Sequence, residues 1–151
     1  MTVSDYLVSM SRQYGVISKE KALAGGRAQY KGYKDLIVYQ LAYSLAMEVF
    51  RETKRFPVEE RYSLVDQLRR SSRSIAANIA EAWKKRKYEK LFVSKLIDCS
   101  GEAAEVEVWL DLSLDCGYLP KEKHEHFVGR YDEVSRMLYS MINQPEKFCR
   151  S

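Results

Sequence analysis

The sequence lacks the features that mark several large classes of protein. No apolar run approaches the roughly 18 residues of a membrane-spanning helix, and the start, MTVSDYLVSMSRQYG, has no cationic lead followed by an apolar block. We therefore expect no signal peptide and no membrane partner, and a cytoplasmic location. No strand-like alternation or hairpin signal occurs either, which favours an all-α fold.

Cysteine and histidine are few and scattered. The three cysteines, Cys99, Cys116 and Cys149, are an odd number at wide spacing, and we interpret them as reduced core residues. His124 and His126 lie two residues apart, which places them on different sides of a helix. Because no Gly-rich phosphate loop is present either, the sequence predicts no metal site and no cofactor.

What is present indicates one globular domain with an uneven charge distribution. A chain of 151 residues, 46% hydrophobic and 30% charged, can bury about 68 to 70% of its unfolded surface without a disulfide or metal. The net charge is only +4, but residues 61–90 carry nine basic and three acidic side chains, whereas residues 91–120 carry one and six. This reversal indicates either a basic face for an anionic partner or two neighbouring helices that attract each other.

Hydrophobic periodicity divides the chain into three parts. Residues 1–34 have weak periodicity and form an N-terminal extension, residues 35–143 form a bundle, and residues 144–151 form a tail. Within the bundle, we predict helices from Asp35, as N-cap, to about Thr53, from about Glu59 to Lys85, from Tyr88 to Cys116, and from Pro120 to Asn143. Gly117 is the expected left-handed cap of the third helix. Short connections predict an up-down-up-down antiparallel four-helix bundle.

Each helix carries an apolar line at spacings of three and four. The second helix has Val65, Leu68, Ser72, Ile75, Ile79 and Ala82, the third has Phe92, Leu96, Cys99, Ala103, Val106, Leu110 and Leu114, and the fourth has Phe127, Tyr131, Val134, Leu138 and Met141. A small polar line of the second helix, Gln67, Ser71, Ser74 and Asn78, favours close helix packing.

The first and third helices carry more apolar surface than one bundle buries. The first is apolar on nearly every side, so either the core of the domain or another subunit must surround it. The third has a second apolar line, and Gly101 in mid-helix indicates close approach by another element. This line is Val93, Ile97, Ala104, Val108 and Leu112. The surplus predicts self-association, and a ring of copies would join their basic faces into a belt.

A basic face on the second helix is the candidate nucleic-acid site. At 100° per residue, Arg69, Arg73, Lys84 and Lys87 share a narrow sector with two alanines, and Arg70 borders it. The candidate contacts are Arg69, Arg70, Arg73, Lys84, Lys85 and Lys87. The alternative is a solvated face, in which Asp66 pairs with Arg70 and Glu81 with Lys85. The sequence leaves open whether the face is exposed or buried between subunits.

An enzymatic reading rests on three carboxylates. Asp98, Glu102 and Glu105 lie at spacings of four and three on one helical face, as in a metal-dependent hydrolase. No second acidic pair or Glu-x-x-His motif completes a bimetal bundle site. We therefore expect a non-enzymatic protein, with the hydrolase as the less favoured reading and a structural protein adaptor as the main alternative to nucleic-acid binding.

The most specific motifs lie within residues 67–82. QLRRSSRSI and NIAEA are similar to the Gln-Leu-Arg-Arg and Asn-Ile-Ala-Glu-Gly motifs of the four-helix-bundle proteins encoded in intervening sequences of 23S ribosomal RNA genes. The resemblance covers about Tyr33 to Met141 and includes YKDLIVYQLAYSLAMEVF and GEAAEVEVWLDLSLDCGYL. Ala82 stands where that family usually has Gly, and WKKRKY replaces a turn richer in Gly and Ser, so we expect the second and third helices to join more continuously.

That family is similar in turn to the accessory protein of diversity-generating retroelements. The accessory protein is a barrel-like pentamer that binds nucleic acid through basic surfaces and partners a reverse transcriptase. The resemblance implies a homopentamer here, with RNA or DNA and a reverse transcriptase as partners. It also implies that Arg69, Arg70 and Arg73 contact nucleic acid.

Overall fold

The computed structural model describes residues 30–149, in which four long α-helices occur and no strand. The helices are α3 (Ile37–Thr53), α4 (Leu64–Lys84), α5 (Glu89–Asp115) and α6 (Lys121–Asn143). Short 3-10 turns lie at Tyr33–Asp35, Val58–Glu60 and Pro145–Lys147. The all-α prediction is confirmed for this range. The predicted extension, residues 1–34, falls almost entirely outside the described residues.

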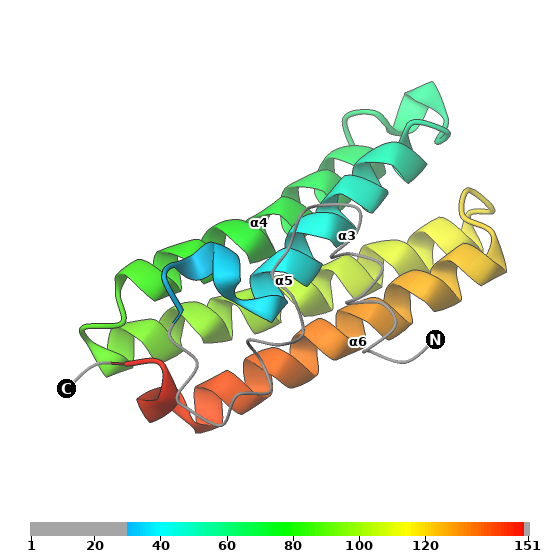
Figure 1. The fold of residues 1–151 in the computed structure, drawn as a ribbon. Coiled ribbons are helices and arrows are strands. Elements are labelled where there is room, and N and C mark those ends of the chain that lie inside the picture. The colour runs from blue at the N-terminus through cyan, green and yellow to red at the C-terminus, as the bar shows by residue number, and fades with distance from the viewer. Residues whose placement is uncertain (1–29, 150–151) are drawn as a thin grey trace.

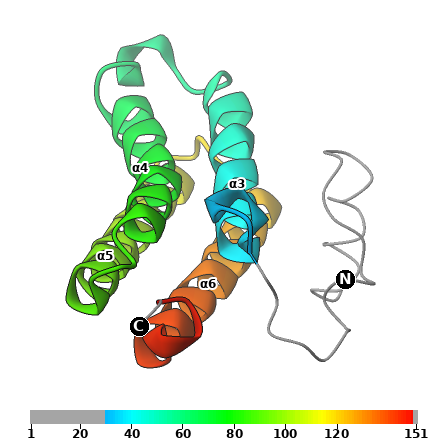
Figure 2. The ribbon, with the colours of Figure 1, turned by 60° about the vertical axis from the view of Figure 1, so that its left-hand side comes forward.

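The four helices pack along their lengths (Figure 1). The helix α4 packs against α3 and α5, and α6 packs against the same two helices. The helices α3 and α5 are diagonal to each other, because their Cα atoms nowhere come within 8 Å. Figure 2 shows this arrangement, with α4 and α5 as one pair and α3 and α6 as the other. Each of the diagonal helices therefore keeps an outward face of its own.

The predicted core lines are confirmed with few exceptions. In α4 and α6 every predicted core residue is buried, and in α5 every one except Leu114, which is half-buried. Because these lines recur at helical spacing on three helices, they meet in one continuous core. Cys99 belongs to this core, but Cys116 is exposed and Cys149 half-buried, so the prediction of three core cysteines is wrong for Cys116. Cys116 caps α5 after its last apolar turn.

The small polar line of α4 packs as predicted. Ser71 is fully buried and donates its hydroxyl proton to the Gln67 carbonyl at 2.7 Å. The Asn78 amide donates to the Ser74 hydroxyl at 3.1 Å and accepts from Lys95 Nζ of α5 at 3.4 Å. Small side chains that satisfy their own polar atoms allow α4 and α5 to approach closely.

Two predicted helix starts are wrong. The second helix begins at Leu64 rather than near Glu59, because the Glu60 carboxylate accepts hydrogen bonds from the Ser63 hydroxyl and the Leu64 amide and so caps a new start. Asp35 does not cap α3, which begins at Ile37 after Leu36. The Asp35 carboxylate instead accepts a hydrogen bond from the Lys31 backbone amide at 2.7 Å and caps the 3-10 turn at Tyr33–Asp35.

The connections between the later helices have clear causes. We expected the second and third helices to join more continuously, but they are separate. The helix α4 ends at Lys84, and a turn at 85–88 precedes α5. The Arg86 guanidinium closes this end by donating to the Trp83 carbonyl at 2.8 Å. Gly117 has φ 76°, as predicted for a left-handed cap. Pro120 then caps α6, which starts at Lys121.

Both ends of the described range lie against the bundle. The rings of Tyr30 and Phe148 stack at 5.9 Å, Phe148 also stacks on Phe92 at 6.1 Å, and Tyr30 meets Trp83 edge-on at 6.0 Å. Part of the predicted tail is therefore ordered packing. Within the described residues, no helix is both long and apolar enough to traverse a lipid bilayer.

Candidate nucleic-acid interface

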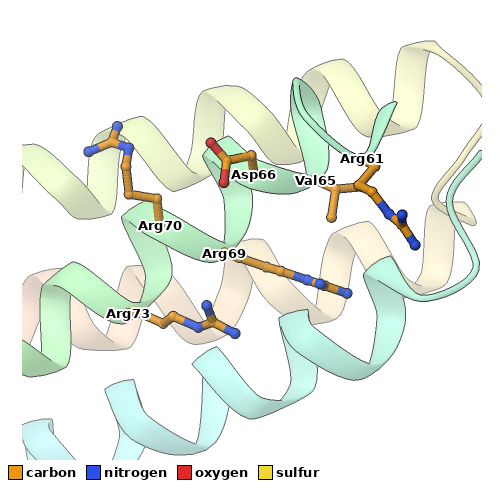
Figure 3. A pocket seen from close by; sticks show the side chains of 6 residues that line it. All are labelled: Arg61, Val65, Asp66, Arg69, Arg70 and Arg73. Carbon is orange, nitrogen blue, oxygen red and sulfur yellow. The ribbon is translucent and has the colours of Figure 1, made fainter. Parts of the chain in front are cut away.

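A hollow of about 430 Å³ lies beside the first half of α4, lined by four arginines together with Val65 and Asp66. The arginines are Arg61, Arg69, Arg70 and Arg73. Figure 3 shows that Arg61, Arg69 and Arg73 extend toward one side, over the end of α3, whereas Arg70 and Asp66 extend to the opposite side. Three guanidinium groups therefore gather on one side of α4.

Arg69 is the most constrained of these arginines. It is half-buried, its Nε donates to the Thr53 hydroxyl at 2.9 Å, and its Nη2 donates to the Phe50 carbonyl at 3.4 Å. Both partners belong to the last turns of α3, so the packing of α4 on α3 fixes the direction of the side chain. Burial, and then the positive charges of Arg73 and Arg61, lower the pKa of Arg69 below its ordinary value.

Three cationic side chains lie close to the ring of Phe50. The Lys54 ammonium lies 4.6 Å from the ring centroid, the Arg69 guanidinium 4.8 Å and that of Arg73 5.9 Å. The negative face of an aromatic ring attracts cations without neutralising them. The group consisting of Lys54, Arg61, Arg69 and Arg73, which we term the arginine cluster, therefore keeps its positive charge.

Within residues 30–149, no carboxylate forms an ion pair with any member of the arginine cluster. Two acidic side chains are engaged elsewhere: Glu52 lies 3.9 Å from Lys123, and the Glu60 carboxylate accepts from the Ser63 hydroxyl, the Leu64 amide and the Tyr118 hydroxyl. Asp66 lines the hollow, but its carboxylate extends to the opposite side from Arg61, Arg69 and Arg73. Like charges held together without a counterion repel each other. An anion from outside the chain would relieve this repulsion.

Arg70 belongs to a different environment. Its guanidinium pairs with the Glu105 carboxylate of α5 and donates to the Gln67 side chain at 3.1 Å. The expected pair with Asp66 is not formed, because α5 offers a carboxylate on the side toward which Arg70 points. The structure thus brings Arg69 and Arg73 together and separates Arg70 from them.

The three lysine candidates lie at the other end of α4. Lys84 is its last residue and is exposed, and Lys85 pairs with Glu81 at 2.9 Å as predicted. Lys87 falls in the turn after α4, with its ammonium 5.8 Å from the Tyr88 ring centroid. The helical projection therefore does not apply to Lys87, because the helix ends before it.

Sequence reasoning missed three members of this site. Arg61 lies in the turn before α4, and Phe50 and Lys54 belong to the end of α3 and the residue after it. Their approach to Arg69 depends on how α3 packs against α4, which the spacing within one helix does not encode. The only sequence signal was the high local charge of residues 61–90.

The carboxylates of the hydrolase reading are engaged separately. Asp98 lies 3.6 Å from Lys95, and Glu105 pairs with Arg70 and accepts from Trp109 Nε1 at 3.2 Å. One oxygen of Glu102 is buried and has no hydrogen-bond partner among the described residues. In the described range, no three His, Cys, Asp or Glu side chains are grouped so as to hold a metal ion.

The outer face of α5 carries an exposed apolar stripe. Ile97 is 54% exposed, Val108 53% and Leu112 44%, and Gly101 and Ala104 lie exposed between them. The sequence predicted that another element approaches Gly101 closely. Within the described residues none does, because a Cβ placed on Gly101 would meet no atom within 4 Å. On α3, Tyr43 is 53% exposed, and Ile37, which lies about 120° away around the helix, is 41% exposed.

Comparison with known proteins gives a consistent result. The family model described as "23S rRNA-intervening sequence protein" matches residues 34–140. A crystal structure of a protein of unknown function from the S23 ribosomal protein family of Bacteroides thetaiotaomicron is similar, with 29% sequence identity and a TM-score of 0.64. The similarity covers 70% of this chain and 98% of that one. No curated protein matches the chain.

Proposed function

Since the chain belongs to the family of 23S rRNA-intervening sequence proteins, we propose that it is a non-enzymatic, oligomeric module that binds RNA or DNA through the phosphate backbone. The observation that carries this proposal is the arginine cluster, whose three guanidinium groups face one hollow and have no carboxylate partner in the described chain. Guanidinium groups form bidentate hydrogen bonds with phosphate, and phosphate contacts are independent of sequence.

Self-assembly follows from the exposed apolar side chains on α5 and α3. The stripe on α5 and the exposed Tyr43 on α3 belong to diagonal helices, which do not contact each other. When two different surfaces of a chain meet, copies join head to tail, and they form a ring where the rotation between copies closes and an open filament where it does not. We propose that α5 of one copy packs against α3 of the next, that the helices of each copy run alternately up and down, and that the ring is a homopentamer.

We propose that this contact uses the part of α3 around Tyr43 and leaves the arginine cluster, which lies over the end of the same helix (Figure 3), accessible to an anion. Each copy then contributes one cluster. Affinity for a polyanion grows with the number of phosphates neutralised, so a ring binds more tightly than a single copy.

The second candidate function is a structural adaptor that holds a protein partner on the α5 stripe. Exposed apolar surface of this kind suits a partner as well as a second copy. Because the family is similar in turn to the retroelement accessory protein, we propose a reverse transcriptase as that partner. An adaptor without a nucleic-acid role would not need the arginine cluster.

Fluorescence anisotropy with a single-stranded RNA at increasing salt tests the proposal. We expect log K to fall linearly with log[salt], and the substitution of Arg61, Arg69 and Arg73 by Gln to reduce the slope by about 2, at about 0.7 per lost phosphate contact. Arg136→Gln is the matched control, since Arg136 lies exposed on α6, pairs with Asp132 and does not line the hollow. Absence of binding at low salt, or an unchanged slope in the triple variant, would contradict the proposal and favour the adaptor.

A further inference from the structure

The hollow beside α4 has the dimensions of a discrete ligand site. Its volume of about 430 Å³ lies within the range of about 300 to 1,000 Å³ typical of small-molecule pockets. A flat basic surface that only tracks a phosphate backbone needs no such hollow. The hollow is an open depression, so it can receive the terminal group of a ligand whose remainder lies on the surface.

The charge of the hollow exceeds the charge of one backbone phosphate. Arg61, Arg69 and Arg73 extend into it from one side, and the Lys54 ammonium lies on the same Phe50 ring as two of them. An internal phosphodiester carries one negative charge. A phosphate monoester carries about −1.5 to −2 at neutral pH and has three terminal oxygens that accept hydrogen bonds.

The Arg69 guanidinium that lines the hollow is fixed in position before a ligand binds. The two bonds from Arg69 to Thr53 and to the Phe50 carbonyl anchor that guanidinium to α3. Its remaining N–H groups are free to donate to a ligand. A site with fixed donors loses little side-chain entropy on binding and favours the ligand that fits its charge.

Asp66 favours the end of a strand over a strand that continues past the hollow. It lines the hollow, but its carboxylate points away from the three convergent arginines, toward the side of Arg70. A backbone that continued past the hollow along that side of α4 would meet this negative charge. A strand that ends in the hollow avoids it.

We propose that the hollow formed by Arg61, Arg69 and Arg73 binds the phosphorylated end of a nucleic-acid strand in preference to its internal phosphodiesters. This inference rests on the proposed function, since it assigns the strand end to the site that we propose for the backbone. The lysines at the far end of α4 then contact the rest of the strand without selecting its end.

The test compares two RNAs of one sequence, about 12 nucleotides long and within the site size of single-strand binders. Both carry a fluorophore at the 3′ end, and they differ only in a 5′-phosphate or a 5′-hydroxyl. At about 150 mM salt, where long-range attraction is screened, we expect anisotropy to give about tenfold tighter binding of the phosphorylated strand. That ratio corresponds to one charge-assisted hydrogen bond.

Two variants locate the preference. The double variant Arg61→Gln and Arg73→Gln removes two convergent charges that make no hydrogen bond within residues 30–149, so the fold should be unaffected, and we expect the two RNAs to bind it equally. Arg136→Gln on α6 is the matched control and should keep the ratio, because Arg136 is exposed, pairs with Asp132 and does not line the hollow. Circular dichroism verifies that all variants remain helical.

The outcomes separate the two proposals. Equal binding of both RNAs to the unmodified protein, or a ratio that persists in the double variant, overturns the preference for the strand end while leaving backbone binding intact. Failure of both RNAs to bind overturns the proposed function as well. If inorganic tripolyphosphate then binds by calorimetry, with loss in the double variant, the hollow serves a free polyphosphate and the strand-end assignment is wrong.

Discussion

The proposed packing of α5 against α3 of a second copy makes a quantitative prediction for Val108→Asp. Val108 lies on the exposed stripe with 53% of its surface open to water. Fully burying an aliphatic side chain contributes about 1.5 to 3 kcal/mol, so roughly half of that, about 1 kcal/mol, is available for the contact between copies. The aspartate loses this contribution and adds the cost of removing a charge from water, which is several kcal/mol.

A total of about 3 kcal/mol corresponds to at least about 100-fold weaker association, since 1.4 kcal/mol is tenfold in Kd. Sedimentation velocity over a range of protein concentrations measures this shift. The monomer mass is 17.6 kDa, and we expect Val108→Asp to sediment as monomer at concentrations where the unmodified protein is larger.

Two further variants make the test specific. Tyr43→Asp on α3 should have the same effect, because the proposed contact uses both surfaces. Tyr139→Asp on α6 is the control, since Tyr139 is 71% exposed but belongs to neither surface. The reasoning is refuted if the unmodified protein sediments as a 17.6 kDa monomer at every concentration, or if all three variants assemble normally.

Three other predictions concern the fold. Ser72→Leu should lower stability by about 1 to 3 kcal/mol, because Ser72 is fully buried in the core line of α4, and a thermal melt that did not shift would show unused space there. Burial raises the pKa of the Cys99 thiol to about 12. A thiol reagent at pH 8 should therefore modify exposed Cys116 and spare Cys99 until the protein unfolds. Rapid modification of Cys99 in the native state would contradict its burial. Hydrogen bonds from Lys85 and then Lys95 lower the pKa of Glu81 below 4.5, so its stabilising contribution is present above about pH 4.5 and is lost as the pH falls through the lowered value. The melting temperature of Glu81→Gln should therefore approach that of the unmodified protein as the pH falls from 5 to 3, and a gap that stayed constant would rule this out.

Most of the fold was predictable because it depends on spacing within each helix. Leu68, Ile75 and Ile79 recur at intervals that only a helix places on one face, and all three are buried. The predicted start of the second helix failed for a local reason, since the Glu60 carboxylate turned out to cap a new helix start at Leu64. Such a cap depends on one side-chain rotamer, which hydrophobic periodicity does not report.

The candidate site was only half predictable. Arg69 and Arg73 are one helical turn apart and were expected on one face, and the structure places them there. Arg70 was grouped with them, but the position of Glu105 on α5 draws it to the other side. Phe50 entered the site through the contact of α3 with α4. Contacts between helices depend on their relative rotation and height, which follow from packing and not from the order of residues.

The aromatic stack of Tyr30 on Phe148 determines where any attached segment would emerge. Because the two rings touch, the described chain starts and stops at one pole of the molecule. Chain that continues from residue 30 and from residue 149 therefore leaves the bundle at neighbouring points.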